Sequence, residues 1–174
     1  MKNYRALVIA TLSVALLLAL VGPTSAQRKG DYMTEGELDI VRDVREINKR
    51  ADVFLTIADR RLAVVADPAA EPDGRLSKYM GPMPTGSQVE LLDDYRHAVE
   101  ELMVKLEDEF ERKGLSPELK KGLEESRDRV AKQIQQIETL KPKLTGDAAQ
   151  FAGKAIEVAR ELQDGAIQAL TAKQ

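Results

Sequence analysis

The chain has 174 residues and a net charge of −3, with no Cys, one His, three Phe and four Tyr. This mild acidity gives no basic footprint for nucleic acid or for an anionic membrane surface. Without Cys no disulfide can form, so a hydrophobic core must hold the fold together. The low aromatic content predicts that Leu, Val, Ile and Ala make up most of this core.

Residues 1–26 have the pattern of a secretory signal peptide. Two basic residues precede an apolar run over 6–21, and Thr24-Ser25-Ala26 offers small residues for cleavage before Gln27. The alternative is an uncleaved membrane anchor, but the run is shorter than the roughly 20 residues that a spanning helix needs. No Cys follows the run, which excludes a lipoprotein anchor.

We therefore expect an exported protein, periplasmic or secreted, with no membrane insertion after cleavage. Residues 27–174 would form a single helical domain of a length that suits one sizeable core. The removed segment carries two basic residues and no acid, so the net charge of the remaining chain is −5.

A long helix is predicted over residues 34–65. Thr34 and Glu37 form a capping box at its start, in which each side chain can bond the backbone N–H of the other residue. The opposite face of the helix is of mixed charge and includes Arg60, as is typical of a solvent-facing side. Apolar side chains repeat in heptad steps along one face: Ile40, Val44, Ile47, Ala51, Phe54 and Ala58.

Residues 66–86 interrupt the helical pattern with four prolines and three glycines. A single helical turn is expected within 76–80, and loops of this length in a compact domain are commonly functional or disordered. Tyr79, Met80 and Met83 either bind a partner protein or cap one end of the core, and we expect the cap. The loop is long enough to leave the direction of the next helix relative to the first open.

Two further helices are predicted over residues 87–113 and 116–141. Ser87 and Glu90 form a second capping box at the start of the first of them. Acids outnumber bases in this helix, whereas bases outnumber acids in the second. These opposite charges favour the two helices as neighbours in the fold, although exposed ion pairs each contribute little.

A four-residue corner, Gly114-Leu115-Ser116-Pro117, joins these two helices. Gly114 suits the position just past a helix end, where a residue without Cβ escapes a steric penalty. Ser116 is a strong cap for the next helix, and Pro117 fits its first position, where no backbone N–H is needed. The corner predicts a hairpin of two long helices.

A last helix is predicted over residues 147–172. Gly153, Gly165 and many alanines make it the thinnest helix and permit close approach of its neighbours. The predicted fold is therefore an all-α four-helix bundle with helices at about 34–65, 87–113, 116–141 and 147–172. Its heptad seams could also join a second copy of the chain into a homo-oligomer.

His97 is the one side chain whose ordinary pKa lies near neutral pH. Its phase on the helix turns it away from the apolar stripe, and Asp93 and Glu101 lie one turn to either side. These three residues are a candidate metal site. The alternative, which we expect, is a solvated acidic face, because structural zinc sites usually use more His or Cys than this chain has.

Other cofactors and catalysis lack the residues that they need. A di-iron bundle requires Glu-x-x-His on two helices, and covalent haem requires Cys-x-x-Cys-His. No nucleophile–base pair or Gly-rich phosphate loop is recognisable. We therefore expect no cofactor, no nucleic-acid partner and no enzymatic activity.

The first helix opens with Leu38-Asp39-Ile40-Val41-Arg42-Asp43 after the signal segment, and the helical hairpin follows. This arrangement resembles uncharacterised exported all-helical bacterial proteins of unknown function, a resemblance that implies no activity. We expect the protein to act by contact with another protein, as a scaffold, adaptor or envelope-associated factor. The alternative is a small-ligand or metal-binding bundle that uses the acidic face around His97 or a gap beside the Ala-rich last helix.

Overall fold

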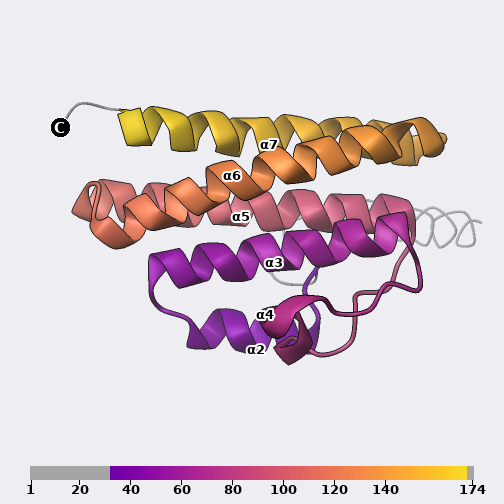
Figure 1. Ribbon diagram of the computed structural model, residues 1–174, viewed down its shortest axis with the longest axis horizontal. Coiled ribbons are helices and arrows are strands. Elements are labelled where there is room, and N and C mark those ends of the chain that lie inside the picture. The colour runs from indigo at the N-terminus through magenta and orange to yellow at the C-terminus, as the bar shows by residue number, and fades with distance from the viewer. Residues whose placement is uncertain (1–31, 172–174) are drawn as a thin grey trace, which may run out of the picture. The chain divides into compact units, whose positions relative to one another are not determined.

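The computed structural model describes residues 32–171, and Figure 1 shows their arrangement. These residues contain six α-helices, one short 3₁₀ helix and no β-strand, which confirms the predicted all-α class. The predicted signal peptide over residues 1–26 lies outside the described residues. The helices are α2 (Glu35–Asp43), α3 (Ile47–Ala66), α4 (Gly74–Tyr79), α5 (Gln88–Lys113), α6 (Pro117–Leu140), η2 (Lys141–Lys143) and α7 (Asp147–Thr171).

The four long helices lie side by side, and the short helices α2 and α4 lie against α3 (Figure 1). α3 packs against α5 and α6, and α7 packs against the same two helices. α5 and α6 touch only sparsely, so the prediction that opposite charge makes them neighbours is wrong. Exposed ion pairs contribute at most about 1 kcal/mol each, so burial of the apolar stripes decides which helices are neighbours.

The predicted first helix is divided into α2 and α3. It breaks at Val44, which is extended with φ −86° and ψ 120°, and α2 folds back along α3 (Figure 1). The carbonyl oxygen of Val44 accepts hydrogen bonds from Arg50 Nε at 3.2 Å and from Arg50 Nη2 at 2.7 Å. The apolar spacing continues through the break, which is why the sequence pattern did not reveal it. The break brings Glu37 against Arg60, which a continuous helix would hold about 35 Å apart.

The Pro- and Gly-rich segment between α3 and α5 folds over α3. It contains α4, which agrees with the single turn expected there. Gly36 of α2 lies so close to this segment that a Cβ added to it would overlap the carbonyl oxygen of Met80. α2, α3 and the α4 segment are therefore packed together as one unit.

The local start and stop signals of the long helices are confirmed. The capping boxes at Thr34 and Ser87 both form. Gly114 ends α5 with φ 65° and ψ −162°, a backbone conformation adopted almost only by Gly. The side chain of Ser116 caps α6, and Pro117 occupies its first turn.

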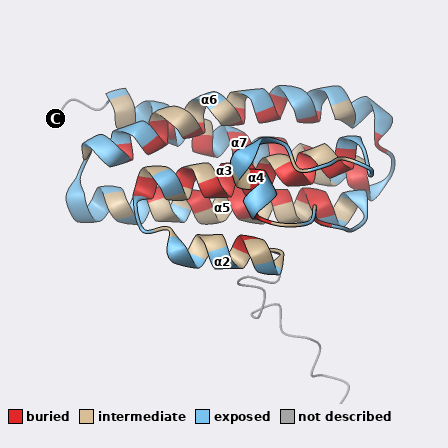
Figure 2. Cartoon of the chain, turned by 60° about the horizontal axis from the view of Figure 1, so that its bottom comes forward, coloured by how far each residue is buried: buried red, intermediate tan, exposed pale blue. Residues whose placement is uncertain are grey.

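Buried residues are concentrated on the facing sides of the four long helices, as Figure 2 shows. The core is mostly aliphatic side chains and Ala, as the composition predicts, and it includes Phe54 and Tyr95. Within residues 32–171, no helix is both long enough and apolar enough to cross a membrane.

Candidate functional site

A cluster of three charged side chains, Glu37, Arg60 and Arg61, is buried between α2 and α3. Each is at most 2 % exposed. The Glu37 carboxylate accepts hydrogen bonds from Arg60 Nε at 2.9 Å, from Arg61 Nη2 at 2.6 Å and from Arg61 Nη1. It also accepts from the backbone N–H of Thr34 at 2.9 Å, within the capping box. We call these three residues the buried charge cluster.

The two arginines of the buried charge cluster donate hydrogen bonds to backbone carbonyl oxygens outside the four long helices. Arg60 donates to the carbonyl oxygens of Ser77 at 2.6 Å, of Gly81 at 3.2 Å and of Pro82. Arg61 donates to the carbonyl oxygen of Tyr32 at 2.6 Å. The expectation that Arg60 lies on a solvent-facing side is therefore wrong, because loop carbonyls and a buried carboxylate surround its guanidinium.

The three loop residues singled out in the sequence have different surroundings. Met80 is fully buried in the core, and Met83 is half-buried against it. Tyr79 is 67 % exposed, and the Arg75 guanidinium lies 5.6 Å from the centre of its ring. Of the three, Tyr79 is the most exposed, whereas Met80 and Met83 pack in or against the core.

The candidate metal ligands Asp93, His97 and Glu101 are bound to other groups. His97 Nδ1 lies 2.9 Å from the carbonyl oxygen of Asp93, and its ring stacks on Tyr32 with 5.7 Å between centroids. Tyr32 Oη donates to Glu101 at 2.9 Å, and Arg96 Nη2 donates to Asp93 at 2.8 Å. Stacking leaves the His97 side chain 29 % exposed rather than fully solvated. In the described part of the chain, no three potential ligand side chains gather closely enough to hold a metal ion.

Asp94, next to this face, lies in an environment that disfavours the charge of its carboxyl group. Burial raises its pKa to about 6, and the charges of Asp93 and Glu90 act in the same direction. Arg61 and His97 oppose this shift. Asp94 thus faces the buried charge cluster from α5 and titrates close to neutral pH.

A second polar network joins α3, α5 and α6. Tyr95 Oη donates to Gln133 Oε1 at 3.0 Å, and Gln133 Nε2 donates to Asp59 at 2.6 Å. Arg129 bridges Asp59 at 2.5 Å and Asp52 at 2.6 Å. An open cleft of about 440 Å³ borders this network beside α4. These charged groups bind one another, so the network ties three helices together.

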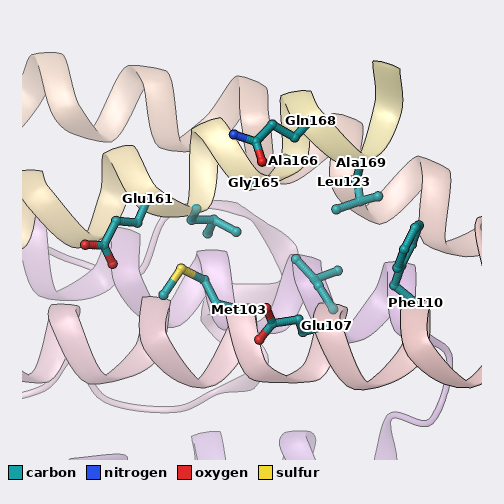
Figure 3. Close-up of a pocket in the computed structure, with 11 residues that line it drawn as sticks. Met103, Glu107, Phe110, Leu123, Glu161, Gly165, Ala166, Gln168 and Ala169 are labelled. Carbon is teal, nitrogen blue, oxygen red and sulfur yellow. The ribbon is translucent and has the colours of Figure 1, made fainter. Parts of the chain in front are cut away.

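An apolar groove lies between α5 and α7, close to the corner that ends α5 (Figure 3). Its volume is about 580 Å³. We call it the α5–α7 groove. Its floor is buried and consists of Leu106, Leu123, Leu162 and Ala166. Its walls and rim are half-buried or exposed and consist of Met103, Glu107, Phe110, Glu161, Gly165, Gln168 and Ala169.

Small residues on α7 leave the groove unfilled. A Cβ added to Gly165 would meet no atom within 4 Å, and Ala166 and Ala169 are too short to reach across to α5. On the facing helix, Phe110 remains 39 % exposed. The groove is therefore a place where the apolar stripes of two neighbouring helices are incompletely covered.

Among the described residues that line the groove, the two charged ones are acidic. Glu107 extends from α5 and Glu161 from α7, and both are exposed. Neither forms an ion pair with a basic residue within 32–171. The groove thus combines an apolar floor with two unpaired negative charges on its rim.

The buried charge cluster was not predicted from the sequence, and the groove was predicted only in part. A gap beside the Ala-rich last helix was part of the alternative function drawn from the sequence, and the groove lies beside this helix. The adjacent Arg60 and Arg61 follow Asp59 in a mostly apolar stretch, residues 54–65, and most of their neighbours there are buried. This was a signal for the cluster that the sequence analysis missed. Their partner Glu37 was recognised only as a capping residue.

No known protein family, curated protein or solved structure gave a significant match to this chain.

Proposed function

We propose that this chain is an exported four-helix-bundle protein that acts by non-catalytic contact with another protein, with the α5–α7 groove as the contact site. The observation that carries the proposal is the open apolar floor beside the partly exposed ring of Phe110. A partner seated in the groove would cover the partly exposed apolar side chains of its walls, Met103, Phe110 and Ala169. Removing this apolar surface from water contributes about 25 cal/mol for each Å². Export rests on the signal-peptide pattern of residues 1–26.

A small apolar ligand is the second candidate, because the groove volume falls in the range of about 300–1,000 Å³ found for ligand pockets. Such pockets usually place a few polar groups where they fix the orientation of the ligand. Here the polar groups, Glu107, Glu161 and Gln168, lie on the exposed rim and none lies on the floor. Side chains of a partner helix need no polar anchor at the floor, which favours protein contact.

The test places a photo-crosslinking residue at Gln168, on the rim, and a matched one at Gln135, an exposed position of α6 that does not line the groove. In the native cell we expect a discrete crosslinked partner from position 168 and none from position 135. Gly165→Leu should abolish this crosslink, because its side chain would occupy open space in the groove.

The matched control is Gly153→Leu, the same change on the same helix but outside the groove. It should leave the crosslink from position 168 intact. Native mass spectrometry of the purified protein decides between the two candidates. A bound small molecule that is lost in Gly165→Leu, together with no crosslink from position 168, would replace protein contact by ligand binding.

A further inference from the structure

We infer that the occupant of the α5–α7 groove is a cationic amphipathic helix of a partner protein. This inference rests on the proposed function, and it adds the chemistry of the partner. It is carried by charge complementarity, because the groove is apolar along its floor and carries an exposed carboxylate on each side, Glu107 from α5 and Glu161 from α7. A helix that fits must present apolar side chains on one face and Lys or Arg beside that face.

The groove has the length and spacing that a helix requires. On α7 its lining runs from Glu161 to Ala169, about 12 Å at 1.5 Å per residue, or about two helical turns. On α5, Met103, Leu106 and Phe110 follow steps of three and four, so they form one continuous wall. A partner helix laid in such a groove inserts apolar residues at positions i, i+3 or i+4, and i+7.

Glu107 and Glu161 set the sign of the partner. They project from opposite helices, so each can reach basic side chains on a different edge of the inserted helix (Figure 3). An acidic helix or an anionic lipid headgroup would instead place like charge beside both carboxylates. Because the two carboxylates are exposed, they should act mainly on the rate of association and on its dependence on salt.

The test uses fluorescence anisotropy of the purified protein with synthetic helices of about 18 residues, a length above the roughly 12–15 residues at which isolated helices are marginal. One peptide combines Leu and Ala with Lys on the polar face. A second has Glu in place of every Lys, and a third has the composition of the first in scrambled order.

We expect the Lys peptide alone to bind, with an affinity that falls as salt is raised. The double variant Glu107→Lys with Glu161→Lys should weaken this binding by about tenfold or more, since two attractive pairs become repulsive. Glu35→Lys with Glu71→Lys changes the net charge by the same amount at two exposed residues that do not line the groove, so this double variant is the control for net charge and should bind normally. Gly165→Leu should abolish binding, and Gly153→Leu should not.

Other outcomes separate this inference from the proposed function. Equal binding of the Lys and Glu peptides, unaffected by the rim charges, would overturn the cationic partner and leave the groove as a contact site. If none of the peptides binds while the crosslink from position 168 persists, the cationic partner is likewise overturned and the groove remains a contact site. A dimer in analytical ultracentrifugation that dissociates in Gly165→Leu would identify a second copy as the occupant and overturn the inference. Loss of both the peptide binding and the crosslink would overturn the two proposals together.

Discussion

Two glycines on different sides of the molecule have opposite surroundings. At Gly36, on the side of the buried charge cluster, the space of a Cβ is already taken by the backbone of Met80. At Gly165, in the α5–α7 groove, the same space is empty. The first glycine lets two segments come into contact, whereas the second leaves apolar surface uncovered.

We call the side of the buried charge cluster closed, because its space is filled, and the side of the α5–α7 groove open, because space remains there. Around the buried charge cluster, Glu37 and backbone carbonyls accept hydrogen bonds from Arg60 and Arg61, so α2 and the α4 segment are fixed to α3. Within residues 32–171, Arg61 Nε is the one nitrogen of the cluster that is buried without a partner. In the α5–α7 groove no polar bond joins the two helices across the floor, which is apolar. The first region therefore stabilises the fold, and the second is available for binding.

The largest loss of stability is expected when the ion pairs of Glu37 are removed. Glu37→Gln should lower the free energy of unfolding by about 3–5 kcal/mol, because it leaves two buried guanidinium groups without a counter-charge. Urea unfolding followed by circular dichroism measures this loss. Hydrogen exchange should show α2 and residues 77–82 opening first, since the cluster holds both segments.

Glu35→Gln is the matched control for this prediction. It removes the same charge from the same first turn of α2, but Glu35 is exposed. Its effect should be within about 0.5 kcal/mol, as for ordinary surface substitutions. Equal tolerance of the two changes would show that the buried charge cluster does not hold α2 in place.

Gly36→Ala adds a single Cβ where α2 meets the backbone of Met80. The added atom overlaps a backbone oxygen, so either α2 or the α4 segment must move. We expect a loss of about 2–3 kcal/mol in the free energy of unfolding, within the range found for overpacked sites. Thermal melts of the purified variant measure it, and an unchanged melting temperature would mean that the contact between Gly36 and Met80 is not formed.

The sequence predicted the parts of this structure that depend on neighbouring residues. The helix starts at Ser87 and Ser116 depend on hydroxyl groups that accept hydrogen bonds from nearby backbone N–H groups, and the helix end at Gly114 depends on a residue without Cβ. All three lie where they were expected. The break at Val44 and the burial of Arg60 depend on contacts between residues far apart in the chain, which no local pattern contains. The prediction that α5 and α6 are neighbours was wrong for the same reason.

The candidate site was predictable in part. The small residues of the last helix, including Gly165, were expected to permit close approach of its neighbours, and a gap beside this helix was considered only for the alternative function. The position of the groove near Phe110 was not predicted, because it requires α7 to lie beside α5, whereas the sequence indicated only that α5 and α6 are joined by a tight corner. Phe110 is partly exposed because the small residues of α7 that face it are too short to cover it.

Asp94 offers a smaller test of the closed side, through pH. Its pKa is raised to about 6 from an ordinary value of about 3.9, so the folded state binds its proton more tightly than the unfolded state does. This group therefore contributes stability below about pH 4, and the contribution is lost as pH rises through about 6. At pH 7, Asp94→Asn should raise the free energy of unfolding by about 1 kcal/mol, a value reduced for the partial exposure of the carboxyl group.

Urea unfolding of the wild type and of Asp94→Asn at several pH values measures this difference. The gap between the two proteins should be wide at pH 7 and should narrow toward pH 4, because the wild-type carboxyl group becomes protonated. Asp108→Asn, at an exposed position of the same helix, is the control and should give a small gap at every pH. A constant gap for Asp94→Asn would show that its carboxyl group is not the source of the pH dependence.

The smallest effect is expected from Gly165→Ala in the α5–α7 groove, and it is a gain in stability. Ala is favoured over Gly within a helix by about 0.8–1 kcal/mol, and here the added Cβ meets no other atom. The variant should therefore be more stable than the wild type by about 0.5–1 kcal/mol in urea unfolding. The same Gly-to-Ala change would then destabilise the protein at residue 36 and stabilise it at residue 165, because backbone fills the first space and nothing fills the second. A loss of stability at residue 165 would mean that the space beside α7 is occupied in the isolated protein, and the groove would then have no room for a partner.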